Sequence, residues 1–368
     1  MVFYLEPGLA RFGARKGNTG VTMNSGIPYL LREAGPEDLD AIERLAELLD
    51  TMNLPRDRRL LAALLERSVH SFRSFRARAA DPAEEMYLFV LEDRATGAPI
   101  GTSLIIAKHG TLASPHFFME IRTDDRSSKI PPRAFHHRVL RLGYSTDGPT
   151  EVGGLVLHPD HRRLAEAFGK QLSFVRFNFM ARHPERFQKE VLAELLSALD
   201  EEGKNLFWEV YGRKLTGLSY READRLSAVD KKFILSLFPQ VDLYVALLPE
   251  NVQAVLGEVA PSAQGAQHLL MKIGFRPLNQ IDPFDGGPYF GAPTGDVTII
   301  RDTLWRVAAP GDVPGSGERR LVSHEGPHGF RALCTPVRVG PAEVVIAPEA
   351  CEVLGAGPGE RLAVTPMP

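Results

Sequence analysis

Alternating apolar and polar positions predict the first elements of the chain one after another. The segment YLLREA (29–34) is typical of a strand. Apolar residues then recur at helical spacing across 39–48, and again across LLAALLERSVHSF (60–72). The segment EMYLFVLEDRATGAPIGTSLII (85–106) has two apolar runs around a D-R-A-T-G turn, which predicts an antiparallel hairpin. The order so far is strand, helix, helix, hairpin.

A polar, histidine-containing region (115–148) separates this part from the next strand. GGLVLHP (153–159) is predicted to be that strand, and it leads through a basic loop into a long helix. Further helices are predicted by four segments: VLAELLSALDEE (191–202), NLFWEVYGRKL (205–215), SYREADRLS (219–227) and KKFILSLF (231–238). Residues 251–279 then predict two short helices and a strand.

Helical periodicity ends at about residue 310, where Gly and Pro become dense. Three short β-type runs remain, RALCTPVRV, AEVVIAP and RLAVTP, and they predict a small β domain. The expected class is α+β. The expected organisation is a flexible extension (1–27), a first domain (28–200), a helical and strand continuation that completes the substrate site (201–310) and the β domain (311–368).

Composition limits the classes of function. The chain has 368 residues, is 44% hydrophobic and carries a net charge of -3, as expected for a globular protein that binds neither nucleic acid nor an anionic membrane. Neither a membrane-length apolar run nor the apolar core of a signal peptide is found, so a cytoplasmic protein is expected. Two cysteines, Cys334 and Cys351, do not make a disulfide framework or a zinc site, and no metal is expected.

The strongest chemical signal lies where the strand 153–159 meets the loop HRRLAEAFG (161–169). Amide groups at a helix start attract phosphate, arginines add positive charge, and small residues allow close approach. The pyrophosphate of an acyl-CoA would suit this loop, although basic residues before a helix are ordinarily just solvated. The element order is that of the GNAT acyltransferase fold. The candidate residues for acyl-CoA are Leu155, Val156, Arg162, Arg163, Ala167 and Gly169.

Several ordered blocks show a more specific resemblance. They are YLFVLEDRATGAPIG, GLVLHPDHR, RFNFMA, LFWEVYGRK, KKFILSLFP, GFRPLNQIDPFDGGP and LVSHEGPHGFR. Their order resembles the arginine N-succinyltransferases, and FDGGP is specific to that family. The resemblance implies a GNAT-like fold, succinyl-CoA as co-substrate, and transfer of succinyl to the α-amine of arginine by direct attack on the thioester. It also implies a homo-oligomer, or a hetero-oligomer with a paralogous subunit.

Three departures from the family pattern leave alternatives open. Ala260 in GEVAP stands where the family has a histidine, Glu120 falls near a family arginine, and the pyrophosphate loop is about two residues longer. Alanine cannot transfer a proton. His328 in GPHGFR and Glu151, acting through a water, are the candidates for catalysis. The alternatives are a non-catalytic or regulatory subunit and an acyltransferase for a different amine.

The acids of IDPFDGGPYF (281–290) are candidates for holding a cationic substrate. Asp282 and Asp285 could pair with a guanidinium or an amine, or could cap amides of the tight Gly-Gly-Pro turn, and both interpretations are kept. Glu120 and Glu209 are further candidates for substrate binding. His116 is expected to be an ordinary exposed polar residue. The same is expected of His136 and His137, which are adjacent to each other in the sequence.

Overall fold

The computed structural model describes residues 26–48, 53–76, 84–200 and 204–368. Residues 1–25 of the predicted N-terminal extension (1–27) lie outside the described residues. The strands are β1 (Tyr29–Glu33), β2 (Met86–Asp93), β3 (Ala98–Ile106), β4 (His116–Lys129), β5 (Pro132–Ser145), β6 (Thr150–Leu157), β7 (Glu190–Glu194), β8 (Leu243–Tyr244), β9 (Arg276–Ile281), β10 (Pro288–Pro293), β11 (Leu304–Pro310), β12 (Glu318–Gly326), β13 (Gly329–Val339), β14 (Glu343–Ile346) and β15 (Arg361–Pro366).

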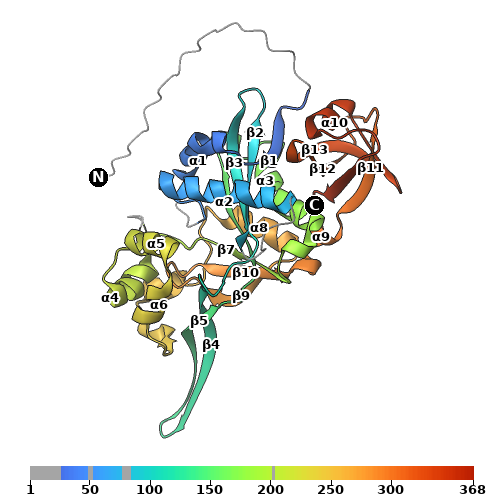
Figure 1. The fold of residues 1–368 in the computed structure, drawn as a ribbon. Coiled ribbons are helices and arrows are strands. Elements are labelled where there is room, and N and C mark those ends of the chain that lie inside the picture. The colour runs from blue at the N-terminus through green and yellow to red at the C-terminus, as the bar shows by residue number, and fades with distance from the viewer. Residues whose placement is uncertain (1–25, 49–52, 77–83, 201–203) are drawn as a thin grey trace, which may run out of the picture.

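The helices cover the sheet and form a separate group beside it (Figure 1). They are α1 (Leu39–Ala46), α2 (Arg58–Arg76), α3 (Phe168–Arg182), α4 (Arg213–Thr216), α5 (Tyr220–Val229), α6 (Lys232–Leu237), α7 (Glu250–Val255), α8 (Gln264–Lys272), α9 (Thr298–Arg301) and α10 (Pro348–Leu354). A π-helical turn, Trp208–Gly212, leads into α4. The mixture of helices and strands confirms the predicted α+β class, and the order from β1 to α3 is the one predicted for a GNAT-like fold.

The central strands are covered on both faces. Along β2, Met86, Leu88 and Val90 pack with α1 and α2, whereas Tyr87 and Phe89 face the core that holds α3. Successive side chains of a strand point to opposite faces. A strand buried on both faces therefore reads as one continuous apolar run, as MYLFVLE does.

The C-terminal strands close into a small barrel. β12, β15, β11, β14 and β13 are neighbours in that order, and β12 also pairs with β13. β13 continues into the central sheet by pairing with β1. The barrel includes β11 (Leu304–Pro310), which the sequence assigned to the preceding segment ending at residue 310.

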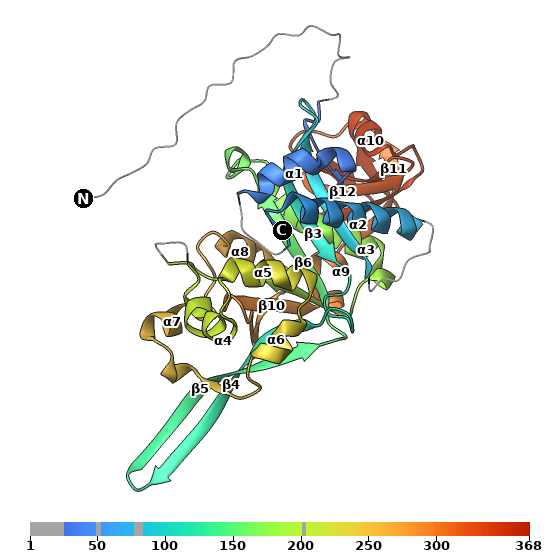
Figure 2. The same ribbon diagram turned by 60° about the vertical axis from the view of Figure 1, so that its left-hand side comes forward.

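Two segments differ from the predicted elements. The predicted helix at 191–202 is instead β7, whose Val191, Leu192 and Ala193 are buried between β6 and β10. Pairing with these neighbours overrides the helical preference of VLAELL. The polar region 115–148 forms the long β4–β5 hairpin, which projects from the body (Figure 2). Its outer half is exposed on both faces, so its sequence lacks the alternation of a half-buried strand.

Candidate active site

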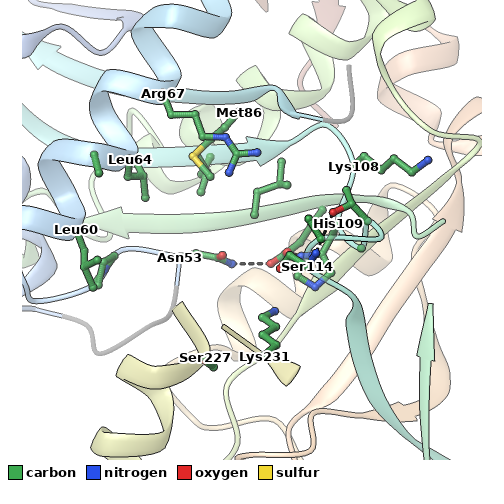
Figure 3. Close-up of a pocket in the computed structure, with 18 of the residues that line it drawn as sticks. Asn53, Leu60, Leu64, Arg67, Met86, Lys108, His109, Ser114, Ser227 and Lys231 are labelled. Atoms are coloured by element: carbon green, nitrogen blue, oxygen red, sulfur yellow. Dashed lines mark hydrogen bonds and ion pairs between the residues drawn. The ribbon is translucent and has the colours of Figure 1, made fainter. Parts of the chain in front are cut away.

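A cavity of about 1070 Å³ lies beside the centre of the sheet (Figure 3). One wall is formed by α2, through residues such as Leu60, Leu64 and Arg67. The facing wall comes from α5 and from Lys231, just before α6. Glu151 of β6 and Glu194 of β7 line the cavity between these walls. The cavity therefore joins the core strands to the helical group.

β6 and β7 separate close to this cavity. They are parallel but pair only at Thr150 with Val191 and Glu151 with Leu192. Beyond Glu151 the two strands have no further pairing, and Leu155 and Val156 lie on the part of β6 that pairs with β3 but no longer with β7. Val156 is buried and Leu155 partly buried. This divergence is the feature that a GNAT-like fold would use to admit an acyl-CoA.

The predicted pyrophosphate loop is an exposed turn before α3. Arg162 and Arg163 are exposed, and the Arg162 Nε donates to the carbonyl of Leu157 at 2.9 Å. Arg163 and Ala167 have φ of 59° and 54°, a conformation that is uncommon for residues other than glycine. Ala167 is the N-cap of α3, and no side chain caps the helix. Gly169 lies in its first turn. Uncapped amides next to two arginines suit an anion.

Glu151 is held by two neighbours at the base of the cavity. Its Oε1 accepts from Nδ2 of Asn53 at 2.6 Å, and its Oε2 lies 2.6 Å from Nδ1 of His109. Burial opposes its ionisation, but His109 and the Asn53 hydrogen bond outweigh this effect and lower the pKa of Glu151. The ionised carboxylate orients the imidazole, so that Nε2 of His109 points the other way.

His109, His116 and Glu194 converge on one point. Nε2 of His109 lies 3.8 Å from Oε1 of Glu194, and Nδ1 of His116 lies 4.0 Å from the same oxygen. Both histidine atoms are buried and have no hydrogen-bond partner among the described residues. Burial lowers the pKa of His116 well below its usual value, so this imidazole is neutral. Burial, with the charge of Glu151 next in importance, raises the pKa of Glu194 well above its usual value.

The spacing of these three groups is wide for a metal ion. Nε2 of His109 and Nδ1 of His116 lie 3.8 and 4.0 Å from Oε1 of Glu194, whereas zinc bonds of 2.0–2.1 Å place tetrahedral ligand atoms about 3.3 Å apart. We therefore do not assign them as metal ligands. No other group of three or more His, Cys, Asp or Glu side chains is close enough to hold an ion in the part of the chain that the structure describes.

Asp282 and Asp285 sit behind the cavity and hold the turn between β9 and β10. Oδ1 of Asp282 accepts from the amides of Phe284 and Asp285 at 2.7 and 2.9 Å. Oδ1 of Asp285 accepts from the amide of Gly287 at 2.6 Å, and Oδ2 accepts from the amide of Ser197 at 3.2 Å. Burial and then the charge of Asp282 raise the pKa of Asp285 to about 7. The structure thus shows the capping role in full.

The comparisons with known proteins identify the family. Residues 29–299 match the family described as "Arginine N-succinyltransferase beta subunit", and residues 304–366 match its C-terminal domain. The chain belongs to the arginine N-succinyltransferase family. The predicted resemblance is confirmed, and with it the enzyme class of an acyl-CoA-dependent N-acyltransferase.

Relatives of this family member match over nearly its whole length. An "Arginine N-succinyltransferase" of Yersinia pestis is 32% identical over 323 residues, covering 86% of this chain and 90% of the relative. An "Arginine N-succinyltransferase subunit alpha" of Pseudomonas aeruginosa is 33% identical over 336 residues, covering 90% and 97%. The solved structure of arginine/ornithine succinyltransferase subunit AI from Pseudomonas aeruginosa superposes with a TM-score of 0.81 at 31% identity, covering 93% of this chain and 100% of that one.

Three predicted site residues of this succinyltransferase family member lie away from the cavity. His328 is in the turn between β12 and β13, beside a smaller depression with Arg32 and Arg331. Glu120 pairs with Arg122, its neighbour on β4. Glu209 pairs with Arg213 one helical turn away, at 2.9 Å. The structure does not bring these three groups to Glu151.

The histidines of the hairpin divide between its base and its outer part. His136 is exposed and pairs with Asp125, and His137 stacks on Phe135. His116 is buried, contrary to the expectation of an exposed polar residue. The first residues of β4 are buried, and there the ring of His116 packs against the ring of Tyr289.

Asn53, His109, Glu194 and Lys231 are among the cavity residues that the sequence patterns did not indicate. His109 directly follows the apolar run of β3, a usual place for a site residue at the end of a strand. Glu194 was assigned to a helix, and recognising β7 as a strand beside β6 would have placed it next to Glu151. Neither Asn53 nor Lys231 lies in a pattern that indicates such a role.

Proposed function

We propose that the protein transfers the succinyl group of succinyl-CoA to the α-amine of arginine. The observation that carries this proposal is the family match across residues 29–299, which contain every residue of the cavity at the β6–β7 separation. The relatives are named for arginine, and one solved structure is named for arginine or ornithine. A non-catalytic role is disfavoured, because buried histidines and carboxylates without a catalytic or binding use are costly.

The donor would bind along the part of β6 that no longer pairs with β7. Its thioester would lie beside Leu155 and Val156, and its pyrophosphate at the start of α3, where Arg162, Arg163, Ala167 and Gly169 form the exposed turn. Positive charge and uncapped amides favour that placement. A backbone amide of β6 would stabilise the oxyanion that forms on the thioester.

The acceptor would occupy the cavity. Glu151 and Glu194 line the cavity, and Asp282 and Asp285 lie close enough behind them for their carboxylate charges to contribute to the raised pKa of Glu194. We infer that these two aspartates act on a cationic substrate through their charge and not by direct pairing, because amides and the Tyr289 hydroxyl engage their oxygens. Arg221 and Arg225 line the wall formed by α5 and would suit a carboxylate.

The reaction is a direct transfer. The amine lone pair attacks the thioester carbonyl carbon, an N–C bond forms and the C–S bond breaks. The nitrogen, which enters as an ammonium, loses two protons in all, and the sulfur gains one of them. The products are an amide and the thiol of CoA. Glu151 would contribute by holding His109, and its action through a water stays a prediction.

The acceptor could also be a different amine. Ala260 and Glu120 differ from the family pattern, although Glu120 lies away from the cavity. Ala260 is buried beside Leu196, whose carbonyl accepts a hydrogen bond from the Ala260 amide at 2.8 Å. A changed acceptor, such as ornithine, would be consistent with these substitutions.

We further propose that the protein works as an oligomer, with further copies of itself or with a paralogous subunit. The Pseudomonas aeruginosa relatives are named as subunits. The outer part of the β4–β5 hairpin carries Ile130 and Phe135, both more than half exposed, well away from the body. Native mass spectrometry of the protein purified alone, and of the protein co-expressed with a paralogous subunit, distinguishes a homo-oligomer and a hetero-oligomer from a monomer.

Release of free CoA tests the function. Acetyl-CoA and succinyl-CoA would each be combined with arginine, ornithine and lysine. The expected result is the highest kcat/KM for succinyl-CoA with arginine. Release only with another amine would overturn the assignment of the acceptor. No release with any pair, by protein that binds CoA in calorimetry, would overturn the proposed reaction.

A paired substitution tests the donor site. In the double variant Arg162→Gln and Arg163→Gln, loss of two positive charges should raise the KM for succinyl-CoA by about tenfold, or roughly 1.4 kcal/mol. The KM for arginine should hold. Arg319→Gln, in the barrel, is the matched control. An unchanged KM for succinyl-CoA would remove this loop from the donor site.

A further inference from the structure

Three acceptor atoms, two of them from the cavity-lining residues His109 and Glu194 and one from the neighbouring His116, lie close enough together for one amine nitrogen to reach them all. Hydrogen bonds of about 2.9 Å from the N–H groups of a tetrahedral nitrogen place their acceptors about 4.7 Å apart. Nε2 of His109 and Nδ1 of His116 lie 3.8 and 4.0 Å from Oε1 of Glu194, and ligand atoms of the three residues all lie within 4.8 Å of one another. The two separations from Glu194 are too long for direct hydrogen bonds. One nitrogen above this triangle can nevertheless reach all three atoms.

The atoms of the triangle have unused capacity to accept. Neither histidine nitrogen has a hydrogen-bond partner among the described residues, and both are buried. Contact of Nδ1 of His109 with the Glu151 carboxylate favours the proton on Nδ1 and leaves the lone pair on Nε2. A carboxyl oxygen of Glu194 can accept whether or not the group is ionised. Buried polar atoms left in this state favour a ligand that donates to them.

We propose that His109, His116 and Glu194 seat the nitrogen of the acceptor amine, and that Nε2 of His109 takes its proton. This inference rests on the proposed function and adds the residues that bind and deprotonate the acceptor. His116 takes part through the tautomer with the proton on Nε2. Asn53 and Glu151 are positioning residues, because Glu151 contacts Nδ1 of His109 at 2.6 Å and Asn53 holds Glu151 by donating to it at 2.6 Å.

The proton balance follows from these positions. An ammonium enters, gives one proton to Nε2 of His109 and becomes a neutral amine. The resulting imidazolium is stabilised by Glu151, as a carboxylate does for a catalytic histidine. The nitrogen then bonds to the carbonyl carbon, the C–S bond breaks, and a second proton from nitrogen goes to sulfur. His109 finally releases its proton to solvent.

The charged surroundings of the seat suit this step. Glu151 on β6, Glu194 on β7, and Asp282 and Asp285 on the β9–β10 turn place carboxyl groups around it, and Tyr289 on β10, whose pKa burial raises well above its usual value, adds a neutral hydroxyl. Lys231 approaches from the other side of the cavity and points toward His109 (Figure 3). The ionised Glu151 attracts the incoming ammonium, whose charge in turn favours ionisation of Glu194. The nearby lysine disfavours an ammonium and an imidazolium alike, so Glu151 is the group that stabilises the imidazolium.

Isosteric variants of the triangle test the proposal. In His109→Gln we expect kcat with succinyl-CoA and arginine to fall at least 100-fold, the scale of general base catalysis. In Glu194→Gln and His116→Gln we expect the KM for arginine to rise at least tenfold. The dissociation constant for CoA should stay within twofold in all three variants. His268→Gln, on the exposed face of α8, is the matched control.

The positioning role of Glu151 is separable from a structural one. Glu151→Gln should lower kcat and leave the KM for arginine within about threefold. Added imidazole should restore part of the rate to His109→Ala but none to Glu194→Gln. His109→Gln with a kcat within threefold of the parent would overturn the proposal, as would an unchanged KM for arginine in both Glu194→Gln and His116→Gln.

Two further measurements do not depend on the variants folding. In ¹⁵N-histidine NMR of the unmodified protein with CoA bound, arginine should shift the ring nitrogens of two histidines, and no shift would contradict the seat. Dialysis against EDTA should leave the rate unchanged, and a loss restored by zinc would overturn the seat in favour of a metal. An unmodified protein that is inactive with every pair contradicts the proposed function, whereas an active one whose His109→Gln variant is equally active contradicts only this inference.

Discussion

Asp285 shows how one buried carboxylate can serve both the fold and the site. It accepts from the amides of Gly287 and Ser197, and these bonds hold the tight turn against the end of β7. Burial and the charge of Asp282 nevertheless raise its pKa to about 7. The residue is therefore poised to change charge near neutral pH, next to a cavity that we propose binds a cation.

The raised pKa of Asp285 predicts a pH-dependent stability. Between about pH 4 and pH 7 the folded protein keeps a proton on Asp285 that the unfolded chain has released. The free energy of unfolding should therefore fall as the pH rises through this window. In Asp285→Asn this contribution is absent. The free energy of unfolding would be measured in urea from pH 5 to pH 8. The value for the parent minus the value for the variant should fall with rising pH. Parallel curves would contradict the assignment.

At the scale of elements, the divergence of β6 from β7 positions the site. Gly154 follows the part of β6 that pairs with β7, has a φ of 55°, and accepts a hydrogen bond from the hydroxyl of Thr102 at 2.9 Å. An added Cβ there would lie 2.9 Å from Cβ of Leu104. This irregularity coincides with the register shift between β3 and β6. It therefore belongs to the shape of the strand that we propose binds the donor.

Gly154→Ala is expected to destabilise the protein by about 1–3 kcal/mol, because an L-residue is strained at this φ and the new methyl group is crowded. Gly265→Ala is the matched control. Gly265 lies in α8 with nothing within 4 Å of an added Cβ, so that variant should be neutral or gain up to about 1 kcal/mol. Chemical denaturation measures both. Equal stability of the two variants would show that β6 tolerates a regular conformation.

The elements also show what a single sequence can predict. β1, α1, α2, the β2–β3 hairpin, β6 and α3 follow from local periodicity, because each buries a clear face or runs continuously through the core. β7 was missed, since VLAELL favours a helix until β6 and β10 pair with it. The amine seat was missed for a related reason. Its members come from the segment after β3, from β4 and from β7, and only the fold brings them together.

At the scale of the whole molecule, the barrel and the catalytic sheet form one body. β13 pairs with β1, and Leu321, Phe330 and Ala332 of the barrel strands belong to the core that surrounds α3. Polar contacts join the same parts, since Asn178 of α3 donates to the hydroxyl of Thr365 at 2.8 Å. None of the helices in the described ranges is long and apolar enough to cross a membrane.

This shared core predicts cooperative unfolding. Differential scanning calorimetry should give one transition for the chain, with the calorimetric enthalpy close to the van't Hoff enthalpy of the cooperative unit. Two separated transitions, one of them assigned to residues 304–366 by limited proteolysis, would show that the barrel unfolds independently and that its contacts with α3 and β1 are weak.

The central claim is a transfer of succinyl from CoA to the α-amine of arginine, and identification of the product tests it most directly. Purified protein would be incubated with succinyl-CoA and arginine, and the products identified by tandem mass spectrometry. The account predicts arginine succinylated on the α-nitrogen, formed in equal amount with free CoA. Protein that binds CoA but forms no succinylated arginine at saturating concentrations of both substrates would contradict it.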